Sequence, residues 1–233
     1  MHAVIFDWGG TLTPWRSIDY LAAWRSYADV LHPGDAERAT RVAAAIHAAE
    51  EAAWRLARDE HRAFTIGQVL EAARAPEHDD GFAAYRTFWD QATYTDPEVA
   101  PLVKALRGKG LRIGILSSTP WPAAWHEEVL DRDGVLDLFH GRVWSSDLEY
   151  TKPHEGAFRA AMAAVGVDDP ADCVYVGDRP YDDISGAKAV GMRAVLMPHS
   201  DIPASQQVPV TVRPDAVIQR LAELEEVVDG WLT

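Results

Sequence analysis

The sequence predicts an α/β fold: a parallel β-sheet with helices on both faces, interrupted by one all-helical block. Three observations lead to this prediction. An apolar strand at 3–6 runs directly into an acidic residue and two glycines, residues 14–93 show only helical patterns, and short apolar runs alternate with amphipathic stretches after Thr93. Such alternation is typical of βαβ units in a sheet with both faces covered. The helical block is therefore an insertion after the first strand.

The elements follow in order along the chain. After the strand at 3–6, Gly9 and Gly10 require a sharp turn. Within the block, helices are predicted over 18–30, 35–60, 65–74 and 81–92. Asp35 is suited to cap the second of these helices, and Thr65 with Gln68 forms a capping box for the third.

The remaining chain alternates between the two kinds of element. Helices are predicted over 96–107, 122–131, 155–165, 182–190 and 215–228, and strands over 111–116, 141–145, 173–176 and 194–197. The segment 198–214 contains four prolines and is expected to be a surface connection. We therefore expect two units, an α/β core formed by 1–13 and 94–233 and a helical unit formed by 14–93.

Composition limits the class of protein. The chain has 233 residues, 48% of them hydrophobic, and a formal net charge of −14. Nucleic acids and anionic membranes repel such a chain, so neither is an expected partner. Cys173 is the single cysteine and cannot form an internal disulfide, and neither a signal peptide nor an apolar run near 18 residues is recognisable. We expect a cytoplasmic protein, with its oligomeric state left open.

Polar side chains follow several of the predicted strands. They are Asp7 after the first strand, Ser117 and Ser118 after 111–116, Lys152 beyond 141–145, and Asp178 and Asp183 after 173–176. The carboxyl ends of parallel strands meet at one edge of a sheet, where such folds bind ligands. Three carboxylates at one edge repel one another unless a cation lies between them, and oxygen ligands favour Mg²⁺. A lysine and hydroxyls beside that cation suit a phosphate.

The order and spacing of these residues resemble the haloacid dehalogenase superfamily of hydrolases, over essentially the whole chain. The stretch 176–192 resembles the fourth motif of that family, and 14–93 lies where its helical cap is inserted. The resemblance implies a Rossmann-like α/β core with an inserted helical cap. It also implies a Mg²⁺-dependent phosphatase or phosphotransferase that acts on a small phosphorylated metabolite.

The resemblance also implies roles for individual residues. Asp7 matches the nucleophile that forms an aspartyl-phosphate, and Lys152 matches the cation that neutralises charge on nucleophile and phosphate. Ser117 matches the catalytic hydroxyl that hydrogen-bonds the transferring phosphoryl oxygens. The substrate would contact Gly10, Thr11, Ser117, Ser118 and Lys152. The Mg²⁺ ligands would be the Asp7, Asp178 and Asp183 carboxylates and the backbone carbonyl of Gly9.

One position departs from the family pattern. Phosphatases of this family carry a second Asp two residues after the nucleophile, as general acid and base, and this chain has Gly9 there. Proton transfer of this kind contributes about 10²- to 10⁴-fold to the rate. The enzyme is therefore expected to be slow or limited to good leaving groups (acyl, aryl or anhydride phosphates), or to take its acid from elsewhere. Asp19 and the substrate itself are the substitutes considered.

Three alternatives follow from the same departure. Phosphonate-cleaving members carry Asp-Trp-Ala-Gly-Thr, which residues 7–11 resemble, but they need a cap lysine, and 14–93 contains nine Arg and no Lys. Haloacid dehalogenases dispense with Mg²⁺ and typically lack the acidic pair that Asp178 and Asp183 match. A non-catalytic descendant that binds Mg²⁺ and a phosphorylated ligand, or a protein partner, stays open.

Aromatic, histidine and acidic residues near the site support weaker expectations. Either an aromatic-lined pocket or ordinary packing fits the tryptophans Trp8, Trp15, Trp24, Trp121 and Trp125. No histidine pair has metal-ligand spacing, so the expected positions are solvent or helix ends for His126, His140, His154 and His199. Asp182 is expected to be an exposed neighbour of Asp183.

Overall fold

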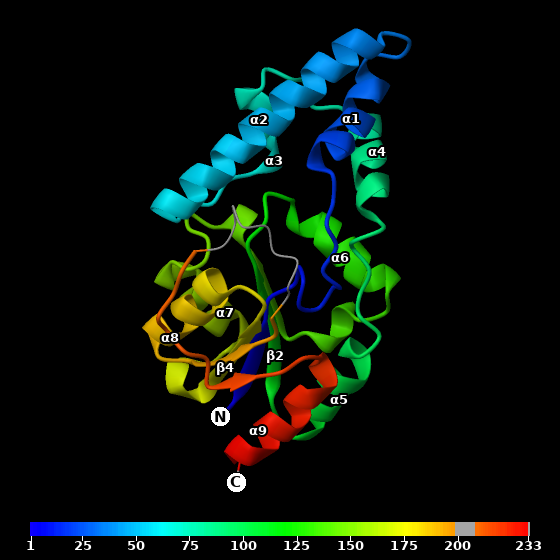
Figure 1. Ribbon diagram of the computed structural model, residues 1–233. Helices are drawn as coiled ribbons and strands as arrows, with labels where there is room; N and C mark the ends of the chain where they lie inside the picture. The colour runs from blue at the N-terminus through cyan, green and yellow to red at the C-terminus, as the bar shows by residue number, and fades with distance from the viewer. Residues whose placement is uncertain (199–207, 233) are drawn as a thin grey trace.

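The computed structural model of the chain describes residues 1–198 and 208–232. Within these residues, six parallel strands form one sheet in the order β3-β2-β1-β4-β5-β6 (Figure 1). The strands are β1 (Ala3–Phe6), β2 (Arg112–Ser117), β3 (Gly141–Trp144), β4 (Cys173–Gly177), β5 (Arg193–Leu196) and β6 (Ala216–Val217). The predicted α/β fold with a parallel sheet is confirmed.

Alternate residues of each strand enter two separate cores, as the two-residue period of a strand requires. Val4 and Phe6 of β1 pack with α5 (Val99–Gly108), α6 (Ala123–Arg132) and α9 (Leu224–Leu232). Ala3 and Ile5 pack on the other face with α7 (Glu155–Val165) and α8 (Gly186–Val190). Burial of each large apolar side chain contributes about 1.5–3 kcal/mol. The two cores hold the strand ends in fixed register, which places the side chains that follow them.

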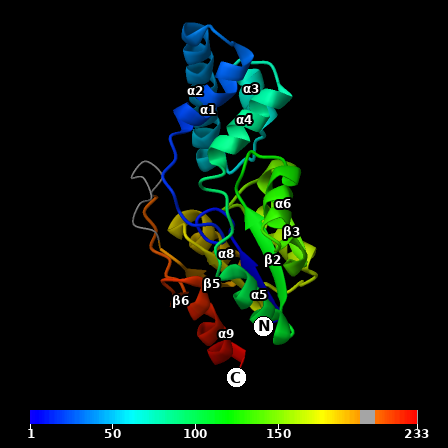
Figure 2. The ribbon, with the colours of Figure 1, turned by 90° about the vertical axis from the view of Figure 1, so that its right-hand side faces the viewer.

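The inserted block consists of four helices with a core of their own. They are α1 (Tyr20–Leu31), α2 (Ala36–Glu60), α3 (Ile66–Ala72) and α4 (Asp79–Trp89). Asp35 caps α2 and the predicted capping box of α3 is present. Figures 1 and 2 both show these helices gathered at one end of the sheet, with α2 extending over it. The unit boundaries after Thr13 and Thr93 stay predictions.

Two predicted helices differ from the structure. Instead of one helix over 182–190, a π-helical turn at Pro180–Ser185 precedes α8. Instead of a helix from 215, Ala216–Val217 forms β6, a 3₁₀ turn follows at Leu221–Glu223, and α9 begins at Leu224. The Asp215 carboxylate accepts a hydrogen bond from the Ala194 amide, and this contact ties the segment to β5. A two-residue strand has too little pattern to be recognised in sequence. Within the predicted connection 198–214, residues 199–207 lie outside the described part.

Backbone contacts join the α2–α3 connection to the core. The Thr151 amide donates to the carbonyl of His61, the Ala63 amide donates to Glu149, and the Ile66 amide donates to Pro120. These bonds hold the carboxyl end of α2 above the loops that follow β2 and β3. Among the described residues, no helix combines the length and apolar character needed to cross a lipid bilayer.

Candidate active site

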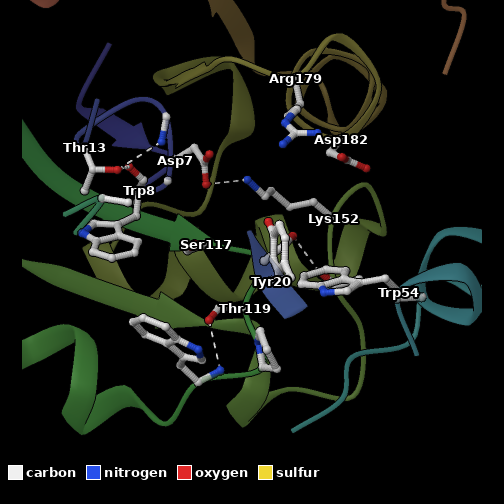
Figure 3. Close-up of a pocket in the computed structure, with 18 of the residues that line it drawn as sticks. Asp7, Trp8, Thr13, Tyr20, Trp54, Ser117, Thr119, Lys152, Arg179 and Asp182 are labelled. Carbon is white, nitrogen blue, oxygen red and sulfur yellow. Dashed lines mark hydrogen bonds and ion pairs between the residues drawn. The ribbon is translucent and has the colours of Figure 1, made fainter. Parts of the chain in front are cut away.

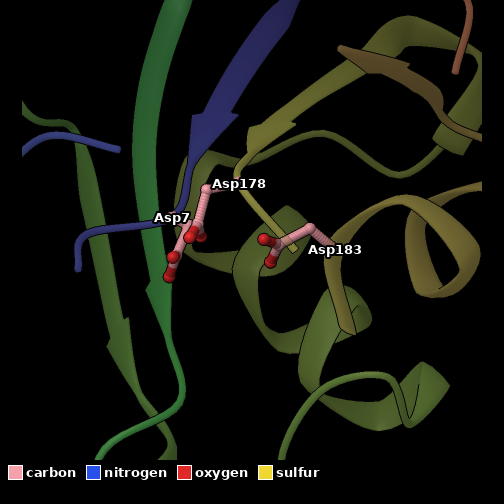
Figure 4. A group of neighbouring side chains, drawn as sticks. All are labelled: Asp7, Asp178 and Asp183. Atoms are coloured by element: carbon pink, nitrogen blue, oxygen red, sulfur yellow. The ribbon is translucent and has the colours of Figure 1, made fainter. Parts of the chain in front are cut away.

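Strand register brings the predicted site residues to one edge of the sheet. Phe6 of β1 is paired with Ile115 of β2 and with Val176 of β4. The Asp7 amide continues the pairing and donates to the Val176 carbonyl over 2.8 Å. Asp7, Ser117 and Asp178 therefore leave three neighbouring strands at almost the same level, and Figure 4 shows the carboxyl groups of Asp7, Asp178 and Asp183 converging there.

The turn after Asp7 depends on its glycines. The amides of Thr11, Leu12 and Thr13 all donate to the carbonyl of Trp8, so the chain folds back within five residues. Gly10 has φ +83°, a conformation that residues with a Cβ rarely adopt. A Cβ there would also lie 3.0 Å from Asp178 Oδ2. Glycine at this position therefore lets the turn approach the Asp178 carboxylate.

Lys152 joins two of the carboxylates. Its Nζ donates to Asp7 Oδ1 over 2.7 Å, to Asp183 Oδ1 over 2.6 Å and to the Tyr175 hydroxyl over 3.1 Å. Burial alone lowers the pKa of Lys152, but the charges of Asp183 and Asp7 outweigh it and hold that pKa well above its usual value. The lysine is therefore a permanent cation beside Asp7.

Burial makes the charged forms of the Asp7 and Asp178 carboxyl groups unfavourable. Burial raises the pKa of Asp7 to about 6, with the attraction of Lys152 opposing it and the repulsion of Asp183 adding to it. Burial, followed by repulsion from Asp183 and Asp7, raises the pKa of Asp178 well above its usual value. Both oxygens of Asp178 are buried without a hydrogen-bond partner, and the nearest cation is Arg179 Nε, 3.4 Å from Oδ2. A buried carboxylate in this state is expected to have a further partner.

The acidic cluster has the donor set of a divalent-cation site. Asp7, Asp178 and Asp183 each offer an oxygen within 4.8 Å of the others. Asp183 already accepts hydrogen bonds from Lys152, Tyr175 and the Arg179 amide, whereas the Asp178 oxygens accept none and are the ones left to coordinate a metal ion. All the side-chain donors are carboxylate oxygens, as Mg²⁺ prefers. The residues therefore fit the ion that the family implies.

A cavity of about 530 Å³ lies between these strand ends and the helical block. Figure 3 shows Asp7 and Lys152 pointing toward each other at this cavity. The predicted site residues that line it are Asp7, Gly9, Gly10, Ser117, Ser118 and Lys152. Asp178 and Asp183 are fully buried beside Asp7. Thr11 is also buried but does not line the cavity, so its predicted substrate contact has no support in this position.

The helical side of the cavity contributes residues that sequence reasoning missed. This wall combines aromatic rings with charged side chains, and Glu50 is a buried carboxyl group among them. The missed residues are Tyr20, Glu50, Trp54, Tyr85 and Trp89. Of the tryptophans considered from sequence, Trp8, Trp15 and Trp121 line the cavity, whereas Trp24 and Trp125 do not. The helical period of α2 offered one signal, since Glu50 falls in the apolar row Ala39, Ala43, Ile46 and Ala57.

Two expectations about polar residues near the site were wrong, and Asp19, a candidate substitute acid, does not line the cavity. His126 is buried rather than solvated, its Nε2 lies 2.9 Å from Thr119 Oγ1, and burial lowers its pKa to about 3. It therefore braces the loop after β2 as a neutral ring.

Asp182 is half-buried and lines the cavity, and burial raises its pKa to about 6. Asp19 is an exposed helix cap that accepts from the Ala22 amide, away from the cavity. Among the other histidines, His154 does cap a helix, and His199 lies outside the described residues.

Curated proteins that resemble this chain in sequence are named as phosphatases. The chain is 32% identical over 161 residues to a glyceraldehyde 3-phosphate phosphatase from Methanopyrus kandleri, which covers 69% of this chain and 64% of that protein. It is 31% identical over 132 residues to a phosphoglycolate phosphatase from Cereibacter sphaeroides, covering 56% and 57%. The matched part spans between 40% and 64% of the first three curated relatives.

Solved structures share the fold. The crystal structure of a HAD phosphatase from Thermococcus onnurineus aligns over 99% of both chains, with a TM-score of 0.66 and 23% identity. An L-2-haloacid dehalogenase from Xanthobacter autotrophicus with chloropropionic acid covalently bound aligns over 99% of both chains, with a TM-score of 0.65 and 19% identity. The family model for haloacid dehalogenase-like hydrolases matches residues 1–191. With the parallel sheet and the site at its carboxyl edge, this match shows that the chain belongs to the haloacid dehalogenase-like hydrolase family.

Proposed function

We propose that this protein is a Mg²⁺-dependent phosphatase or phosphotransferase acting on a small phosphorylated metabolite through an aspartyl-phosphate at Asp7. One observation carries the proposal: the Asp7 carboxylate is paired with Lys152 at the cavity, directly beside the buried Asp178 carboxylate, which accepts no hydrogen bond. The division into a core of 1–13 and 94–233 and a cap of 14–93 is part of the proposal.

The chemistry assigned to these residues is an in-line displacement. Asp7 attacks phosphorus, and the bond from phosphorus to the leaving oxygen breaks. Lys152 holds Asp7 in place and neutralises charge on the phosphoryl group, while Ser117, which lines the cavity, donates a hydrogen bond to a phosphoryl oxygen. Such catalysis is mainly positioning and electrostatic stabilisation.

Mg²⁺ would be held by Asp7 and Asp178, with Asp183 and the Gly9 carbonyl completing the protein ligands. When bound, the ion supplies positive charge that neutralises the phosphoryl oxygens. The two carboxylate oxygens of Asp178 support this assignment, because both are buried and neither accepts a hydrogen bond.

The size of the cavity and the names of the relatives support a small substrate. A volume of about 530 Å³ is in the range of small-molecule sites. Glyceraldehyde 3-phosphate and phosphoglycolate, in the names of the curated relatives, are small phosphate esters. Phosphonate cleavage has less support, because it needs a lysine from the cap. Among the described residues that line the cavity, Lys152 is the one lysine, and it belongs to the core.

Adding Mg²⁺ to the metal-free protein should raise its melting temperature. Saturation at about 100 times the dissociation constant stabilises a fold by about 2.7 kcal/mol, which corresponds to roughly 5–10 °C for a chain of this length. In Asp178→Asn the shift should disappear, because the buried charge that needs the cation is gone. Differential scanning calorimetry with and without Mg²⁺ measures this, and an equal shift in both proteins would contradict the assignment of Asp178.

The proposed activity is tested by a panel of acyl, aryl and alkyl phosphates assayed with Mg²⁺ and with EDTA. We expect Mg²⁺-dependent turnover that is fastest for acetyl phosphate and 4-nitrophenyl phosphate, since no carboxyl group stands at position 9 to protonate a poor leaving group. Absence of turnover across the panel would overturn the proposal and favour a binding protein. A rate independent of leaving-group acidity would contradict the consequence drawn from Gly9.

A further inference from the structure

The cap wall of the cavity carries a buried carboxyl group. Glu50 of α2 is 4% exposed and lines the same cavity as Asp7. Its position on the helix belongs to the buried row that otherwise holds Ala and Ile. An apolar side chain would fill such a position without the cost of burying a carboxyl group. A polar residue that breaks the pattern of its helix is expected at a functional or strained site.

The contacts of Glu50 hold its carboxyl group in one orientation. The Trp24 indole nitrogen donates to Glu50 Oε2 over 2.7 Å. Burial raises the pKa of Glu50 to about 7, opposed by hydrogen bonds from Trp24 and Trp54 and assisted by the charge of Glu51. The other titratable groups that interact with it are the phenols of Tyr20 on α1 and Tyr85 on α4. At neutral pH a large fraction of Glu50 is therefore protonated.

The direction of the reaction places the leaving group on the cap side. In an in-line displacement the attacking and leaving oxygens lie on opposite sides of phosphorus. Since Asp7 attacks from the floor of the cavity, the leaving oxygen points toward the cap helices. Among the described residues that line the cap side, Glu50 and Glu51 are the carboxyl groups, and Glu51 is exposed.

We propose that Glu50 is the proton donor for the leaving oxygen and partly replaces the carboxyl group missing at Gly9. This inference rests on the proposed phosphatase activity. As the Asp7 Oδ–P bond forms and the bond from phosphorus to the leaving oxygen breaks, that oxygen takes the proton of Glu50 and departs as an alcohol. Water then attacks phosphorus without help from Glu50, whose carboxylate regains its proton from solvent. The Asp7 Oδ–P bond then breaks, releasing phosphate and restoring the Asp7 carboxylate.

The decisive variant is Glu50→Gln, because its amide oxygen can still accept the Trp24 hydrogen bond but its amide group does not act as an acid. We expect at least a tenfold fall in kcat for an alkyl ester such as glycerol phosphate, with KM little changed. Turnover of acetyl phosphate and 4-nitrophenyl phosphate should stay within about threefold of the wild type, since these leaving groups need little protonation. Glu60→Gln makes the same change on an exposed residue of α2 and is the matched control.

The pH profile of the unmodified protein gives a second readout that does not depend on a variant folding. Because the acid must be protonated, kcat/KM for the alkyl ester should fall as pH rises above about 7, while the profile for the aryl ester should lack this limb. Glu50→Asp, which keeps a carboxyl group, should retain part of the alkyl activity.

Two results would overturn the inference. One is an alkyl profile in the wild type that shows no decline up to pH 9, and the other is a loss in Glu50→Gln that is equal for alkyl and aryl esters or confined to KM. Failure of the proposed phosphatase activity is distinguishable, because the wild type would then turn over none of the esters.

Discussion

Asp7→Asn is expected to lower phosphatase turnover by roughly 10⁴- to 10⁶-fold, the usual effect of removing a covalent nucleophile. The variant loses the oxygen anion that attacks phosphorus and cannot form an aspartyl-phosphate. It should still fold, because Lys152 keeps its hydrogen bonds to Asp183 and Tyr175 and the Asn oxygen can accept from it. The measurement is turnover of 4-nitrophenyl phosphate with Mg²⁺, together with intact mass after incubation with acetyl phosphate.

The mass measurement separates nucleophile loss from general damage. The wild type should gain one phosphoryl group that hydroxylamine removes, and Asp7→Asn should gain none. Asp131→Asn, on the exposed face of α6, supplies a matched loss of one carboxylate and should behave as the wild type. Phosphorylation of the Asp7→Asn protein to the same extent would show that the nucleophile lies elsewhere.

Gly9→Asp is expected to raise turnover of alkyl phosphates by about 10²-fold, with a much smaller effect on acyl and aryl phosphates. The substitution supplies a general acid at the position where phosphatases of the family carry one, and such an acid contributes about 10²- to 10⁴-fold. The site has room for it, since a Cβ at Gly9 would meet no heavy atom within 4 Å and Gly9 lacks the positive φ of Gly10. The readout is kcat for glycerol phosphate relative to 4-nitrophenyl phosphate.

Gly9→Asn is the matched control for that gain, because it has nearly the same shape and hydrogen-bonding reach without the acidic proton. It should leave the alkyl-to-aryl ratio near the wild-type value. In the Glu50→Gln background, Gly9→Asp should restore alkyl turnover. A folded, Mg²⁺-binding Gly9→Asp protein with no alkyl gain would show that protonation of the leaving group does not limit this enzyme.

The core sheet was predictable because its residues carry a local signal. Apolar runs such as Ile113–Leu116 and Cys173–Val176 are buried on both faces, and that burial forces a near-continuous apolar sequence. The polar residues that follow them were found for the same reason, since each interrupts such a run. The edge strand β6 escaped prediction because two residues cannot show a period and its pairing with β5 is non-local.

The cap side of the site was much less predictable. Glu50 lies in the middle of a 25-residue helix, where a charged residue ordinarily faces solvent. The packing of α1 on α2 contributes to its burial, and the hydrogen bond from Trp24 of α1, 26 residues away, orients its carboxyl group. His126 was misjudged for the same reason, because its ring is packed against Trp8, Trp121 and Trp144 from other segments of the chain.

The order of residues was therefore enough to predict the parallel α/β core, the inserted helices and the residues at the strand ends, including the departure at Gly9. Periodicity and short motifs are local properties, so the order of residues carries them. The folded chain was needed to find which oxygens lack hydrogen-bond partners, which acidic group of the helical block is buried at the cavity, and how much space remains at Gly9. Those properties depend on contacts between segments far apart in the chain, because such contacts decide how deeply each side chain is buried and which charges surround it.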